Sequence, residues 1–287
     1  MYPAAFDYAA PSTLDEVVAL LRQHGDGVRL LAGGHSLIPL MKLRLAQPGH
    51  IVDLRRVAAL RGVRRESGAL VIGAMTTHAE LAKHPDVRDA APIIVDAASH
   101  IGDPQVRNRG TIGGSLAHAD PGADLPSVML ATGASLVVAG PTGTRTIAAD
   151  DFFVDMYTTA LAPNELLTEI RVPLPAARGG GAYVKHAHPA TRFAVVGVAA
   201  TIELERLSNR VQRVRVAVTG FGGKPLRGIA AEEALVGQSL TDEAIAGAAQ
   251  RLADAGAAAT AVADEYKAQL ARVYAERALR AAAERAH

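Results

Sequence analysis

The fold is decided by two short stretches, Ala32-Gly33-Gly34-His35-Ser36 and Thr111-Ile112-Gly113-Gly114-Ser115. Each runs from an apolar or β-branched residue into a Gly-Gly pair and then reaches a serine. Glycine adopts positive φ and lets a ligand approach the backbone closely, and successive N–H groups in such a turn form an anion-binding nest. Two nests predict two loops that close on one phosphorylated ligand, although either loop alone is more often an ordinary tight turn.

Several familiar sites are excluded by the same stretches. Neither has the G-x-G-x-x-G pattern of a Rossmann dinucleotide site, and neither ends in the Gly-Lys-Ser/Thr of a phosphate-binding loop. There is no G-x-S-x-G elbow, so Ser115 is not expected to be a hydrolase nucleophile. We therefore predict a binding site in which no side chain of this chain is catalytic.

A family resemblance follows from the longer context of both stretches. The first, continuing through Leu37-Ile38-Pro39-Leu40-Met41-Lys42-Leu43-Arg44, resembles the first flavin motif of the FAD-binding medium subunits of molybdenum hydroxylases. The run Gln105-Val106-Arg107-Asn108-Arg109-Gly110, which leads into the second stretch, resembles their second motif. Carbon monoxide dehydrogenase is the nearest member, xanthine dehydrogenase has an equivalent domain, and the likeness extends over the whole chain.

The resemblance implies an α+β fold in two domains. Residues 1–176 would form a two-lobed FAD-binding domain of the vanillyl-alcohol-oxidase/PCMH type, with lobes near 1–55 and 56–176. Residues 177–287 would form a smaller α+β domain of the carbon monoxide dehydrogenase flavoprotein type. The Pro/Gly-rich run 173–181 is the best linker between them.

The resemblance also implies the residues that bind FAD. An acid at Asp124 would bond the cofactor, and apolar residues at Ile101 and Leu167 would pack near the flavin ring. A lysine at Lys185 would lie near the carbonyl edge of the ring, and Phe193 would lie against the flavin. The full expected set is Ala32, Gly33, Gly34, His35, Ser36, Leu37, Ile101, Thr111, Ile112, Gly113, Gly114, Ser115, Asp124, Leu167, Lys185 and Phe193.

Each of these roles has a simpler alternative. Asp124 could instead cap a helix that begins at Leu125, which is an ordinary use of aspartate. Ile101 and Leu167 could be plain core residues, and Lys185 could be a surface lysine. In the first stretch, the backbone amides are expected to matter more than the ring of His35.

One segment departs from the family pattern. After the lysine, the carbon monoxide dehydrogenase relatives tend to have a basic residue, then Gly-Asp, then an aromatic. Here the run is His188-Pro189-Ala190-Thr191-Arg192-Phe193-Ala194, which keeps the aromatic and lacks the Gly-Asp. The departure leaves the substrate of the complex open.

Partner subunits are implied by the resemblance as well. A small subunit would carry two [2Fe–2S] clusters, a large one would carry the molybdenum cofactor, and the assembly would be a dimer of heterotrimers. Electrons would pass from the clusters through FAD to an external acceptor. Two alternatives remain: a self-contained flavin oxidase, for which the segment after the linker is short, and a non-catalytic scaffold, against which the intact nests argue.

Composition limits the remaining possibilities. The chain has 287 residues, a formal net charge of +1 and no cysteine. A balanced charge predicts no nucleic-acid partner, and cysteine ligation of zinc or of an iron–sulfur cluster is impossible within this chain. The pairs His118-x-Asp120 and His186-x-His188 are weak metal signals, so no metal is expected. No apolar run approaches the length of a membrane span, and we expect a cytoplasmic protein.

Apolar spacing and turn residues predict mixed helices and strands. The capping-box pattern Ser12-Thr13-Leu14-Asp15 begins a helix whose apolar positions start at Leu14 and which ends at Gly25, and Thr77 opens a second capping box. Ser36 is expected to cap a short helix, and 101–110 is expected to be a loop. Further helices are predicted at 37–45, 91–99, 125–131, 241–255 and 264–286, and strands at 28–32, 51–54, 70–73, 135–139, 145–147, 166–172, 182–186, 194–205 and 211–221.

Overall fold

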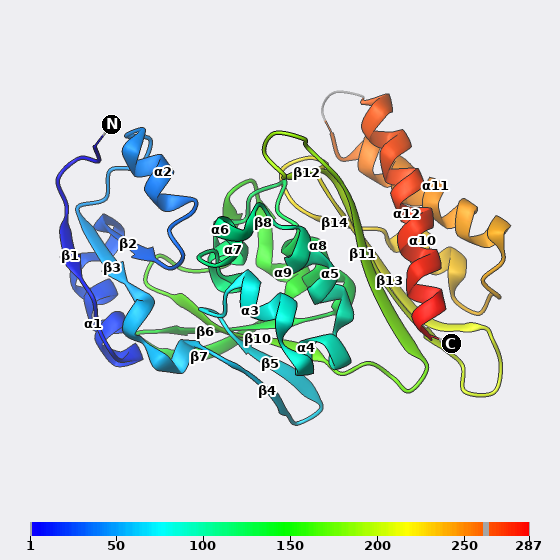
Figure 1. Ribbon diagram of the computed structural model, residues 1–287, viewed down its shortest axis with the longest axis horizontal. Helices are drawn as coiled ribbons and strands as arrows, with labels where there is room; N and C mark the ends of the chain where they lie inside the picture. Colours follow the sequence, from blue (N-terminus) through cyan, green and yellow to red (C-terminus); the bar gives the residue numbers. More distant parts are fainter. Residues whose placement is uncertain (1, 261–263, 287) are drawn as a thin grey trace.

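The computed structural model describes residues 2–260 and 264–286, which form three side-by-side layers of sheet and helix (Figure 1). At one end, a small sheet has the order β1-β3-β2, and both outer strands run parallel to β3. Its helices connect consecutive strands, as parallel pairing requires. The elements are β1 (Asp7–Ala9), α1 (Leu14–His24), β2 (Val28–Leu31), α2 (Leu37–Lys42) and β3 (His50–Asp53), with 3₁₀ turns at Gly25–Gly27, Leu54–Arg56 and Ala58–Leu60.

Helix α1 shows how the sequence sets these elements. The Thr13 hydroxyl accepts from the backbone N–H of Glu16, whose carboxylate accepts from the backbone N–H of Thr13, so a capping box is formed one residue later than the predicted pattern from Ser12 to Asp15. Val17 and Leu21 share the buried face of the helix. Gly25 follows with φ +55°, which confirms the predicted end.

The central layer is an antiparallel sheet in the order β4-β5-β10-β6-β7. Helices α5 and α8 lie between this sheet and the next one and contribute to one continuous apolar core. The strands are β4 (Val63–Glu66), β5 (Ala69–Gly73), β6 (Ser135–Gly140), β7 (Gly143–Ala148) and β10 (Leu166–Pro173), and a small hairpin pairs β8 (Phe153–Asp155) with β9 (Thr158–Thr159). The helices are α3 (His78–Lys83), α4 (Pro85–Ala90), α5 (Pro92–His100), α6 (Pro104–Arg107), α7 (Ile112–His118), α8 (Leu125–Thr132) and α9 (Ala149–Phe152).

The C-terminal layer is a sheet in the order β11-β12-β13-β14. Strand β12 is buried along most of its length because α8 covers one face of the sheet and α12 covers the other. Gly180 lets α12 approach closely, since a Cβ there would fall on the backbone of Ala282 and Ala286. The elements are β11 (Gly179–Ala187), β12 (Ala194–Leu204), β13 (Val211–Thr219), β14 (Leu226–Arg227), α10 (Ile229–Leu235), α11 (Asp242–Ala258) and α12 (Glu265–Ala286).

Three local expectations need correction. The segment 101–110 contains the short helix α6, which begins at Pro104 because the carboxylate of Asp103 accepts from the N–H of Val106. Strand β11 begins at Gly179, so the glycines predicted to belong to a linker pair with β12 instead. Ser36 makes no capping hydrogen bond to α2.

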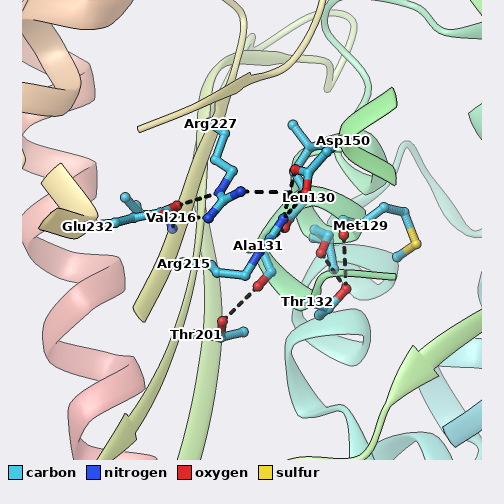
Figure 2. A network of polar contacts seen from close by, with 11 residues as sticks. Met129, Leu130, Ala131, Thr132, Asp150, Thr201, Arg215, Val216, Arg227 and Glu232 are labelled. Carbon is cyan, nitrogen blue, oxygen red and sulfur yellow. Dashed lines mark hydrogen bonds and ion pairs between the residues drawn. The ribbon is translucent and has the colours of Figure 1, made fainter. Parts of the chain in front are cut away.

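A polar network joins the C-terminal sheet to the central layer (Figure 2). Arg215 on β13 donates from Nε to the carbonyl of Leu130 at 2.8 Å and from Nη2 to both carboxylate oxygens of Asp150. Arg227 joins Asp150 to Glu232, whose carboxylate also accepts from the N–H of Val216. The network fixes α8 and α9 against β13, and therefore fixes Asp124, at the start of α8, relative to β11.

Candidate functional site

The two glycine stretches meet at one cavity of about 600 Å³. The cavity lies where the layers converge, because it is lined from the small sheet by Leu30, from the central layer by Ser115 and Leu167, and from the C-terminal sheet by Phe193. Every residue of the expected FAD-binding set lines it except Ile112 and Lys185. Ile112 is fully buried in the central core instead.

Glycine is required at this junction because the two stretches touch. A Cβ on Gly33 would overlap the carbonyl oxygen of Arg109 and would lie 2.9 Å from Cα of Gly110. A Cβ on Gly113 would lie 2.5 Å from Cβ of Ala74. Distances this short are not available to a side chain, so glycine is required at Gly33 for the first stretch to pack against Arg109 and Gly110, and at Gly113 for the second stretch to pack against Ala74.

The first stretch carries the free donors. Within the described part of the chain, the backbone N–H groups from Gly33 to Leu37 have no hydrogen-bond acceptor. Gly34 adopts φ +82°, so the backbone makes a tight turn where this run of N–H groups lines the cavity. Five consecutive free donors at one wall indicate a site for an anionic ligand.

The second stretch is built differently from the nest predicted for it. Thr111 caps α7 by accepting from the N–H of Gly114 at 3.1 Å, and the N–H of Gly113 donates to the carbonyl of Ala74 at 2.9 Å. Neither glycine has positive φ. Their N–H groups are therefore engaged within the protein, and these glycines serve close approach, while Ser115 adds a hydroxyl to the cavity wall.

Apolar side chains also line the cavity. Ile101 is half-buried, Leu167 is buried, and both contact the central core as well as the cavity. Phe193 is 49% exposed although it is a large aromatic residue, and it lines the same space. A cavity lined both by free amide donors and by apolar side chains suits a ligand with a flat ring and a charged tail.

Asp124 is the buried acid of the site. Its carboxylate accepts from the Tyr183 hydroxyl at 2.5 Å and from the ammonium of Lys185 at 2.9 Å. Burial raises the pKa of Asp124, while the Lys185 charge and the Tyr183 hydroxyl act against that rise. The same burial, together with the Asp124 charge, raises the pKa of Tyr183 well above its usual value.

Two of the alternatives for this cluster are thereby excluded. Asp124 makes no side-chain capping bond to α8, and the side chain of Lys185 is only 4% exposed, so it is not a surface lysine. Lys185 also donates to the carbonyl of Arg192 at 2.8 Å. Lys185 does not line the cavity; its ammonium instead holds the Asp124 carboxylate and the turn that leads to Phe193.

Sequence reasoning missed three neighbours of the cavity. Tyr183 could have been found, since residues two apart on a strand share a face and Lys185 was already singled out. His78 lines the cavity from the first turn of α3, where the sequence shows only a capping box. Tyr157 stacks near His118 and bonds Asp120 at 3.4 Å, which no local pattern indicates.

The cavity fits FAD by its chemistry. The free amides from Gly33 to Leu37 suit a diphosphate, and the apolar wall of Ile101, Leu167 and Phe193 suits an isoalloxazine ring. Its volume lies within the range of about 300–1,000 Å³ usual for cofactor pockets. Among the residues that the structure describes, no cluster of three metal-ligating side chains is present and no helix is long and apolar enough to cross a membrane.

Comparisons with known proteins point the same way. Residues 4–175 match the family described as the FAD binding domain in molybdopterin dehydrogenase, and residues 181–282 match the CO dehydrogenase flavoprotein C-terminal domain. The chain is 43% identical to the carbon monoxide dehydrogenase medium chain of Hydrogenophaga pseudoflava over 98% of both chains. It is 35% identical to the 6-hydroxypseudooxynicotine dehydrogenase complex subunit alpha of Paenarthrobacter nicotinovorans, over 100% of this chain and 97% of that one. A solved carbon monoxide dehydrogenase structure from Hydrogenophaga pseudoflava superposes with a TM-score of 0.94 at 44% identity, covering 99% of both chains.

Proposed function

The chain belongs to the family of FAD-binding medium subunits of molybdenum hydroxylases, and from this premise we propose that it relays electrons from iron–sulfur clusters on a partner subunit to an external acceptor. Its cofactor is FAD, which when bound accepts electrons singly and releases them singly or in pairs. The protein's own contribution is to hold, orient and shield that cofactor. We propose no catalytic side chain.

The observation that carries the proposal is the polarity of one cavity. Free amides of the first glycine stretch and the apolar side chains of Ile101, Leu167 and Phe193 line the same cavity. A diphosphate at the amides would place the ring between those apolar side chains. Because Phe193 is 49% exposed, the ring end is also the end that faces outward, as electron exchange with a partner requires.

Individual roles follow from the contacts. The donors from Gly33 to Leu37 bind the diphosphate, with the Ser115 hydroxyl facing them. Asp124 bonds a polar group of the cofactor, while Tyr183 and Lys185 fix its carboxylate. Ile112 supports the second stretch from the core and makes no contact of its own with the ligand.

The assembly is part of the proposal. Relatives that match over nearly the whole chain are named as a medium chain, a subunit alpha or a subunit beta of dehydrogenases, which supports partner subunits here. We propose a small iron–sulfur subunit and a large molybdenum subunit, arranged as a cytoplasmic dimer of heterotrimers. In this chain, residues 1–176 would be the cofactor domain and 177–287 the second domain.

The substrate is bound by the large subunit in this proposal. The named substrates of the relatives range from carbon monoxide to 6-hydroxypseudooxynicotine. In this chain the run that lacks Gly-Asp closes a turn, since the N–H of Arg192 donates to the carbonyl of His188 and Arg192 has φ +63°. That turn positions Phe193 at the cavity.

Affinity purification from the native cells tests the function. With a tag on this chain, we expect FAD, iron and molybdenum to copurify in stoichiometric ratio, and the flavin absorbance to bleach when substrate is added. Purification of this chain alone, with FAD and with oxidation of an added substrate, would instead support a self-contained oxidase. A chain that purifies without any flavin absorbance would indicate a scaffold.

A further inference from the structure

His78 is a buried histidine that the proposed function leaves without a role. It is 4% exposed, it is the first residue of α3, and it lines the cofactor cavity. Its Nδ1 is sealed from the surface and has no hydrogen-bond partner in the described residues. Buried polar atoms are nearly always paired, so an unpaired one beside a ligand cavity calls for an explanation.

The charge state of His78 is fixed by its surroundings. Burial lowers the pKa of His78 to about 4, with smaller contributions from His35 and Arg107. The imidazole is therefore neutral at physiological pH and carries one N–H and one lone pair. A bare lone pair is tolerated better than a bare N–H in a protein interior. Because Nδ1 has no acceptor, the proton belongs on Nε2.

Nε2 is the ring nitrogen that remains open. No hydrogen bond to it is formed within the described residues, yet it is not sealed from the surface as Nδ1 is. His78 thus presents an unused N–H donor on a ring whose other nitrogen is buried. The ring cannot move far, since the backbone N–H of His78 is held by the carbonyl of Gly110 at 3.0 Å.

The position of this donor points to one part of the cofactor. A Cβ on Gly110 would lie 3.0 Å from Nε2 of His78, so the ring stands directly against that residue. Gly110 precedes Thr111 and also lies against Gly33, at the contact between the two glycine stretches. The donor therefore stands at the contact between the two glycine stretches, next to the free amides of the first stretch.

We propose that His78 is a diphosphate-binding residue, whose Nε2–H donates to a phosphate oxygen of FAD at the junction of the two glycine stretches. The inference rests on the proposed location of FAD in this cavity. A neutral donor complements the amides without placing a buried positive charge in the apoprotein. The arrangement lowers the stability of the protein, because Nδ1 stays without a hydrogen bond both with and without FAD.

Because of this loss of stability, the two possible roles of His78 predict opposite changes in the melting temperature of the FAD-free chain. In His78→Leu, a side chain of similar size removes the unpaired nitrogen, so the FAD-free full chain should melt at the same temperature or higher. FAD binding should nevertheless weaken by about 10- to 100-fold, the effect expected for one lost hydrogen bond to a charged group. A structural role predicts the opposite, with a lower melting temperature of the FAD-free chain.

Two variants and one probe complete the design. His78→Gln keeps an N–H donor and should recover FAD affinity to within about threefold of wild type. His84→Leu is the matched control, because Nδ1 of His84 is also buried without a hydrogen bond, at 3.9 Å from the Asp86 carboxylate, and His84 lines a different cavity; its FAD affinity should equal that of wild type. ADP, which carries the diphosphate without the ring, should lose affinity for His78→Leu in proportion to FAD.

Each contrary outcome has a defined meaning. Unchanged FAD affinity in His78→Leu, or weakened FAD affinity with unchanged ADP affinity, would overturn the assignment to the diphosphate. Gly114→Val separates this failure from failure of the proposed site. If Gly114→Val loses FAD while His78→Leu keeps it, only the role of His78 is wrong. If both keep FAD, the cofactor lies elsewhere and the proposed site is wrong as well.

Discussion

Replacement of Lys185 by methionine tests the buried cluster of Asp124, Tyr183 and Lys185. The Lys185 ammonium lies 2.9 Å from the Asp124 carboxylate, and both side chains are almost wholly buried, with exposed fractions of 4% and 5%. Methionine keeps the length of the side chain and removes the charge. Breaking a buried ion pair from one side costs about 3–5 kcal/mol, because the remaining charge is left without its partner. We expect a loss of that size in the free energy of unfolding at pH 8.

The loss should depend on pH in a definite direction. Burial already raises the pKa of Asp124, and the Lys185 charge is the largest influence that lowers it, so the variant raises the folded-state pKa further. A carboxyl with a folded pKa above its unfolded value is protonated more readily in the folded state. The pKa of Asp124 is raised in both proteins, so the deficit that depends on pH is absent below the folded-state pKa of wild type, grows above it, and is complete above the higher folded-state pKa of the variant.

Urea titrations of wild type and variant at pH 5 and pH 8 measure the effect. The deficit should be larger at pH 8, and the double variant Asp124→Asn with Lys185→Met should show a deficit that does not change with pH. A deficit below about 1 kcal/mol, the size expected of an exposed pair, would contradict the buried ion pair. So would an equal deficit at both pH values.

The same variant reports on the cofactor. A full charge-assisted contact corresponds to roughly 30–60 mV in a two-electron potential. We expect FAD to stay bound in this variant. Since Asp124 neutralises much of the Lys185 charge, the midpoint potential of FAD should fall by roughly 30 mV, the smaller end of that range. An unchanged potential in a spectroelectrochemical titration would remove Lys185 from the residues that influence the flavin.

Three further outcomes are expected. FAD should be noncovalent, since the chain has no cysteine for a thioether bond, and acid precipitation should release all the yellow colour into the supernatant. Gly114→Val should lose FAD while keeping most of its circular-dichroism signal, because a Cβ there meets Thr111 Oγ1 at 2.8 Å and disturbs the cap of α7; stoichiometric FAD in this variant would place the second stretch outside the site. Arg215→Leu should lower the free energy of unfolding by about 1–3 kcal/mol, because the Leu130 carbonyl and Asp150 lose their donor, whereas Arg206→Leu on the exposed turn should have no effect in the same denaturant titration.

Local patterns were sufficient for much of the fold. The capping box at Thr77 and the positive-φ glycine after α1 are formed as predicted, and the first capping box is formed one residue after its predicted start, at Thr13, since each depends only on residues within one helical turn. The family resemblance, and with it FAD as the cofactor, followed from two contiguous motifs and is confirmed by the matches over both parts of the chain. Contiguous residues that bind one ligand leave their signature in sequence order.

The tertiary structure decided what the residues of those motifs do. The sequence shows two similar Gly-Gly-Ser stretches, but only packing reveals that the first keeps its amides free while those of the second bond to Ala74 and Thr111. It also pairs Asp124 with Lys185, residues separated by 61 positions. Burial and pairing across such separations depend on how the layers meet, and no local propensity encodes them. For the same reason, the sequence shows His78 only as part of a helix cap. Only the folded structure shows that it is an unused hydrogen-bond donor at the cavity.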